Sequence, residues 1–104
     1  MALENKGEYG HIEVSAQVFK ELAQIVSLRH DEVVPKNQND FAACVISRDG
    51  EIRITIELKI RQGIDVLNTC RQIQNEVHEI IEDMTGIDVK IINIDIQGFV
   101  AEVS

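Results

Sequence analysis

The sequence has few aromatic residues and few of the residues that interrupt regular structure. Aromatic side chains make up 4% of the 104 residues, tryptophan is absent, and there is one proline. The core must therefore consist of Ile, Val and Leu, which favours a β-sheet covered by helices. A chain of this length forms one core and not two. We predict a flexible N-terminus over residues 1–8 and a single domain over residues 9–104.

Basic residues are also scarce. Ten Lys and Arg face 18 Asp and Glu, which gives a net charge of −8 and a pI of about 4.7. This charge repels phosphate backbones and anionic lipid headgroups, so no nucleic-acid partner is expected. No apolar run approaches the roughly 18 residues of a membrane span, and residues 1–7 lack the apolar region of a secretion signal. We expect a cytoplasmic protein without direct membrane insertion.

Cysteine and histidine are too few and too scattered to indicate a metal or redox site. Cys44 and Cys70 lack Cys-x-x-Cys spacing, so reduced, partly buried thiols are the favoured interpretation, with a disulfide only if packing brings them together. His11, His30 and His78 have no partner at a recognised ligand spacing and are interpreted as surface residues. Phosphate-binding glycine loops and nucleophile elbows are missing too. We predict no enzyme activity, no catalytic residue, no cofactor and no metal.

The sequence does contain clear strand and helix patterns. Apolar and polar residues alternate most strictly over 52–61, and Asp49-Gly50 before this run indicates a hairpin turn. The expected strands are residues 9–14, 41–47, 52–61 and 89–96. The expected helices run from Ser15 to about residue 29 and from Asp65 to about Met84. Residues 31–40 are expected to be a surface loop. This order predicts an α+β fold, a two-layer β-α-β-β-α-β arrangement whose four-stranded, mainly antiparallel sheet carries two helices on one face.

Each expected helix has one apolar stripe. The first stripe comprises Val18, Leu22, Ile25 and Val26, widened by Phe19 and Ala23, and the second comprises Val66, Cys70, Ile73, Val77, Ile80, Ile81 and Met84. Asp65 is a suitable N-cap for the second helix. Gly86 can take the left-handed conformation that ends it.

Four acidic residues crowd the last two turns of the second helix, namely Glu76, Glu79, Glu82 and Asp83. The helix macrodipole is negative there, and like charges three or four residues apart repel, so the arrangement costs a few tenths of a kcal/mol to about 1 kcal/mol per contact. Two interpretations remain open. The residues form either a solvated face or a docking surface for a basic partner.

Residues 64–98 resemble the alkaline-shock-protein family of Gram-positive bacteria, also described as the Gls-type envelope stress response family. The matching segments are Val66, Gln74-Asn75-Glu76-Val77, Ile80-Ile81-Glu82-Asp83-Met84-Thr85-Gly86, Val89 with Ile92-Asn93-Ile94, and at the front Gly10-His11-Ile12-Glu13-Val14-Ser15 with Val18. The stretch 30–35 departs from the family because it lacks the glycine that usually follows its glutamate.

The resemblance implies a protein without catalytic residues that is linked to the cell-envelope stress response or to envelope homeostasis. It also implies a cytoplasmic location, with attachment to the membrane through a membrane-anchored protein partner. We expect a protein-interaction module that self-associates, since sheet edges and a narrow helix stripe offer surfaces for pairing. The alternative is a small regulatory protein that binds and modulates a lipid-metabolism enzyme. A third interpretation, an unrecognised enzyme, has no residue to support it.

Overall fold

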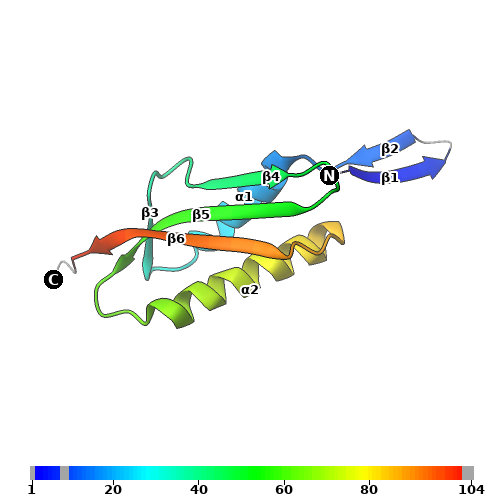
Figure 1. The fold of residues 1–104 in the computed structure, drawn as a ribbon. Coiled ribbons are helices and arrows are strands. Elements are labelled where there is room, and N and C mark those ends of the chain that lie inside the picture. The colour runs from blue at the N-terminus through cyan, green and yellow to red at the C-terminus, as the bar shows by residue number, and fades with distance from the viewer. Residues whose placement is uncertain (1, 8–9, 102–104) are drawn as a thin grey trace.

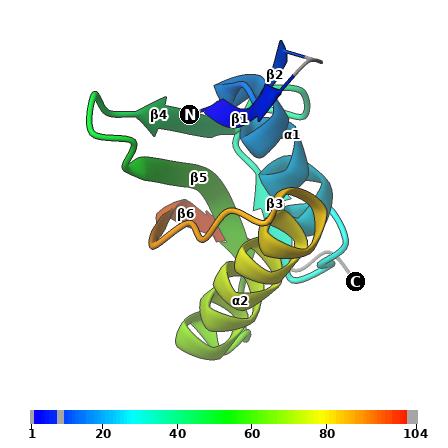
Figure 2. The same cartoon turned by 90° about the vertical axis from the view of Figure 1, so that its right-hand side faces the viewer.

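A computed structural model describes the backbone of residues 2–7 and 10–101 and the side chains of residues 14–101. Its elements are β1 (Ala2–Gly7), β2 (Gly10–Glu13), α1 (Ala16–Ser27), β3 (Val33–Pro35), β4 (Ala42–Ile46), β5 (Ile52–Arg61), α2 (Val66–Thr85) and β6 (Ile91–Val100). The predicted α+β class is confirmed, with a four-stranded sheet and two helices on one of its faces (Figures 1 and 2).

Strand β5 is the centre of the sheet. It pairs antiparallel with β3 at one end and with β4 at the other, and it pairs parallel with β6 over residues 53–61. Because β6 occupies one edge of β5 along nearly its whole length, β3 and β4 must share the opposite edge. Two of the three pairings are antiparallel, as expected for the β4–β5 hairpin, whose turn has Gly50 at φ 87°.

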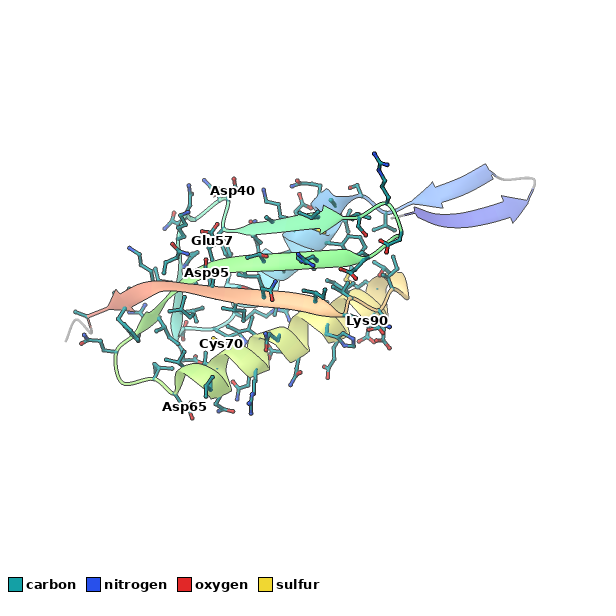
Figure 3. The ribbon with its side chains drawn as sticks, viewed as in Figure 1. Asp40, Glu57, Asp65, Cys70, Lys90 and Asp95 are labelled. Atoms are coloured by element: carbon teal, nitrogen blue, oxygen red, sulfur yellow. The ribbon has the colours of Figure 1, made fainter. Side chains whose placement is uncertain are left out.

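The strict alternation over residues 52–61 separates a buried face of the sheet from an open one. The side chains of Ile52, Ile54, Ile56, Leu58 and Ile60 are 0–3% exposed beneath the helices. Residues between them carry the charges of the open face, where Glu57 lies opposite Asp95 in the register with β6 (Figure 3). One face of β5 therefore builds the core, and the other meets solvent.

The two helices bury different fractions of their predicted stripes. In α2 the stripe holds at Ile73, Val77 and Ile81, which are fully buried, but Met84 at its end is 66% exposed. In α1 the buried residues include Phe19, Leu22, Ala23 and Val26, whereas Val18 and Ile25 are 39% and 50% exposed. The burial predicted from the stripes was wrong for Val18 and Ile25, because the sheet lies against a face of α1 centred on Phe19 and Ala23. It was also wrong for Met84, which lies in the last turn of α2.

The ends of α2 follow from its sequence. Asp65 accepts a hydrogen bond from the backbone N–H of Asn68 at 3.2 Å and caps the first turn. Gly86 takes φ 73° and donates its N–H to the carbonyl of Glu82, which closes the last turn in the left-handed conformation. Ser15 precedes α1 with extended backbone but forms no side-chain cap bond.

The first predicted strand, residues 9–14, lies outside the four-stranded sheet. Strand β2, which contains most of the predicted strand 9–14, pairs antiparallel with β1 in a separate two-stranded sheet (Figure 1). Both edges of β5 are occupied by β3, β4 and β6, so this strand cannot pair with the central strand. Residues 8 and 9, at the predicted boundary of the N-terminal segment, lie outside the described residues.

The fourth strand of the sheet is β3 and not the predicted strand 9–14. Strand β3 lies within the stretch that was predicted to be a loop. Val33, Val34 and Pro35 pair with Ile60, Lys59 and Leu58. Backbone bonds flank this pairing, from Arg61 N–H to the Glu32 carbonyl and from Lys36 N–H to the Glu57 carbonyl. The prediction of a loop over residues 31–40 was therefore wrong for residues 33–35, where a proline is tolerated because the strand is short and at an edge.

Candidate functional site

The four acidic residues predicted as a partner surface all lie exposed on the C-terminal half of α2. We call Glu76, Glu79, Glu82 and Asp83 the acidic surface. Glu76 and Glu82 are six residues apart, so their side chains leave the helix roughly 120° apart around its axis. The acidic surface therefore spans two flanks of the helix, with Glu79 and Asp83 between them.

Glu76 faces the segment that follows α1. Its Oε2 lies 2.5 Å from Nε2 of His30, and Nδ1 of the same ring lies 3.6 Å from Oε2 of Glu32. The His30 side chain is 11% exposed, so it links the two helices at a partly buried position. The interpretation of His30 as a surface residue was therefore wrong, and the side chain of His11 lies outside the described residues. Glu76 is thus engaged by a neighbour within the chain.

Glu82 faces the opposite flank. Its Oε2 lies 3.6 Å from Nε2 of His78, one helical turn earlier, and this same nitrogen lies 2.7 Å from Oδ1 of Asp88. Asp88 follows the helix and precedes β6. The spacing of the sequence did not identify this group, because Asp88 reaches His78 only after Gly86 turns the chain.

Glu79 and Asp83 form no ion pair with any described residue. The last turn of α2 carries no basic residue, so the negative end of the helix dipole and both carboxylates remain without a local cation. These two side chains are therefore the part of the acidic surface with charge available to another molecule.

The open face and the free edge of the sheet offer a second kind of surface. Within the described part of the chain, β6 pairs with β5 and with no other strand, so one edge of a ten-residue strand is unpaired. Phe99 on this strand is 63% exposed. Gln74 of α2 donates to the Ile92 carbonyl at 2.8 Å and ties the strand to the helix. A long edge of this kind can pair with another chain.

Cys44 and Cys70 are free and half-buried. Burial raises the pKa of both thiols, which lowers the thiolate fraction near neutral pH and makes them poor nucleophiles. The predicted reduced state agrees with this arrangement.

Among the described residues, neither helix combines the length and the apolar character needed to cross a bilayer.

Comparison with known proteins identifies one family. The sequence model of the alkaline-shock-protein family, which is described as having a cell envelope-related function, matches residues 43–101. The match covers more than half of the chain and spans β4, β5, α2 and β6, including the acidic surface. No curated protein and no solved structure matches the chain.

Proposed function

The chain belongs to the alkaline-shock-protein family and has a cell envelope-related function, and we propose that it serves this function as a non-catalytic protein-interaction module. In this proposal the acidic surface docks a Lys- or Arg-rich segment of a protein partner. The partner is anchored in the membrane, and it holds this cytoplasmic protein close to the cell envelope.

The observation that supports docking is the pair of carboxylates on Glu79 and Asp83. Both are exposed and unpaired among the described residues, and they lie at a helix end whose dipole is also negative. Isolated surface carboxylates contribute little to folding, and their mutual repulsion opposes it slightly. A basic partner segment would relieve this repulsion and would be attracted by the net charge of −8.

A crosslinking pull-down of the tagged protein from its native cells tests the proposal. The double reversal Glu79→Lys with Asp83→Lys is compared with the control Glu21→Lys with Asp31→Lys, which changes the net charge equally but lies on α1 and in the loop before β3. We expect a membrane-anchored protein with a basic segment to be captured by the wild type and the control and to be lost with the double reversal. Capture should also weaken with added salt.

Two results would contradict the proposal. Equal capture by the wild type and the double reversal would exclude the acidic surface as the docking site. Recovery of soluble lipid-metabolism enzymes in place of an envelope protein would instead favour the alternative, a small regulator of such an enzyme.

Self-association through the free edge of β6 is the second part of the proposal. A second copy could add its own β6 to the part of this edge beyond Ile92, whose carbonyl already accepts from Gln74, and this part runs past the exposed Phe99. Sedimentation equilibrium should give a mass that rises with protein concentration, and Asn93→Lys on this strand should reduce the rise. Asn39→Lys, in the loop before β4, is the matched control, and equal effects of the two changes would contradict pairing through β6.

A further inference from the structure

The C-terminal end of α2 brings together three side chains with metal-ligating chemistry: His78, Glu82 and Asp88. One potential ligand atom from each lies within 4.8 Å of the other two. All three remain accessible, with side-chain exposures of 38%, 54% and 56%. We propose that this cluster binds one divalent transition-metal ion of the zinc class.

The distances already approach those of a coordinated ion. Ligand atoms about 2.1 Å from a tetrahedral zinc ion lie about 3.4 Å from one another. His78 Nε2 lies 3.6 Å from Glu82 Oε2 and 2.7 Å from Asp88 Oδ1. An ion between them requires rotations of two exposed carboxylates and leaves the backbone in place.

The backbone that carries the three ligands is held on both sides of the cluster. His78 and Glu82 are four residues apart and project from the same side of α2, whose neighbouring residues Val77 and Ile81 are fully buried. Asp88 stands between Ile87 and Val89, which are 6% and 1% exposed. The ligands are therefore presented by anchored segments, which reduces the entropy lost on binding.

The electrostatic surroundings favour a cation. Glu82 lies in the last turn of α2, which has no basic residue and where the helix dipole is negative. Asp49 and Glu51 line a shallow hollow with Asp88 and add negative charge on the far side of the cluster. Lys90 lines the hollows beside Asp88 and His78, at the end of α2 in Figure 3, but it forms no ion pair with a described residue of the cluster.

The donor set selects the class of metal. An imidazole nitrogen with two carboxylate oxygens suits zinc and its neighbours, whereas magnesium and calcium prefer sites made of oxygen ligands alone. Three protein ligands leave a coordination position for water or for a group from another molecule.

This inference goes beyond the proposed function and shares only Glu82 with the acidic surface. The reversals at Glu79 and Asp83 leave all three ligands unchanged, and His78 and Asp88 lie outside the acidic surface. Loss of partner capture and loss of metal binding are therefore separate results.

Isothermal titration of the full chain with zinc chloride tests the site. We expect one zinc ion per chain, and weaker binding in His78→Gln and in Asp88→Asn. Changes to outer-shell groups already reduce metal affinity by about 10–100-fold, so the loss of a ligand should reduce it by at least about tenfold. Nitrogen-detected NMR of the histidine rings should show that zinc shifts the resonances of His78 and leaves those of His30 unchanged.

The controls separate this cluster from other ligands. Glu79→Gln removes one charge from the same helix without removing a ligand and should bind zinc as the wild type does. Magnesium chloride should give no comparable binding. The proposal is overturned if the wild type takes up no zinc, if His78→Gln binds it equally well, or if Cys44→Ser with Cys70→Ser abolishes binding while the His78 resonances stay unshifted.

Discussion

The two helices cover the same face of the sheet but present different outer surfaces. Both expose apolar side chains, namely Val18, Ile25 and the C-cap Leu28 of α1 at 39%, 50% and 56%, and Leu67 and Met84 of α2 at 70% and 66%. Helix α2 exposes the acidic surface on its C-terminal half. The inner faces are alike because both must fill the space over the isoleucines of β5, whereas nothing in the fold requires the outer faces to differ. The difference between them lies in the acidic surface, and the family match covers α2 but not α1.

The largest expected effect on stability comes from truncating a buried side chain on the inner face of α2. Ile73→Ala removes a fully buried side chain and should lower the free energy of unfolding by about 2–5 kcal/mol. Ile25→Ala on the half-exposed side of α1 should cost about 1 kcal/mol or less. Urea denaturation of both variants measures the contrast, and similar losses would show that Ile25 is buried in solution.

The N-cap residues of the two helices should differ by a smaller amount in their contribution to the free energy of unfolding. Asp65→Ala removes the bond to the Asn68 N–H and should cost about 0.5–2 kcal/mol. Ser15→Ala should cost less, because Ser15 forms no side-chain cap bond. The same denaturation experiment compares the two, and a larger loss for Ser15→Ala would contradict the described caps.

The outer face of α2 should not contribute to stability. Glu79→Lys with Asp83→Lys places cations at the negative end of the helix dipole, one of them three residues from both Glu76 and Glu82, so it should raise the free energy of unfolding by a few tenths of a kcal/mol to about 1 kcal/mol. Thermal or urea unfolding measures the gain, which should shrink with added salt. A clear loss of stability would mean that these carboxylates support the fold.

The smallest effect concerns the half-buried thiols on β4 and α2. Since burial raises the pKa of Cys44 and of Cys70, less thiolate is present at neutral pH than in an unfolded chain. Alkylation by iodoacetamide should be slower in the folded protein than in urea, and its rate should rise with pH over the alkaline range. Equal rates in both states at neutral pH would show that the thiols are not protected.

The sequence predicted those parts of the fold that depend on local chemistry. Asp65 and Gly86 mark the ends of α2 because an N-cap and a left-handed glycine act within a few residues. The alternation over residues 52–61 likewise predicted the buried face of β5.

The parts that were missed depend on contacts distant in the sequence. Strand β3 has three residues and one is proline, so its own pattern is too short to indicate a strand, and its pairing with β5 is fixed only by the fold. The cluster of His78 with Asp88 arises because the chain reverses at Gly86. In each case the signal lies in the tertiary arrangement rather than in the spacing of residues.

The most direct test of the proposed docking is the location of a fluorescent fusion in the native cells. We predict that the wild type and the control Glu21→Lys with Asp31→Lys lie along the cell envelope, and that Glu79→Lys with Asp83→Lys is spread through the cytoplasm at the same protein level. If the double reversal stays at the envelope, the acidic surface of α2 is not what holds the protein there.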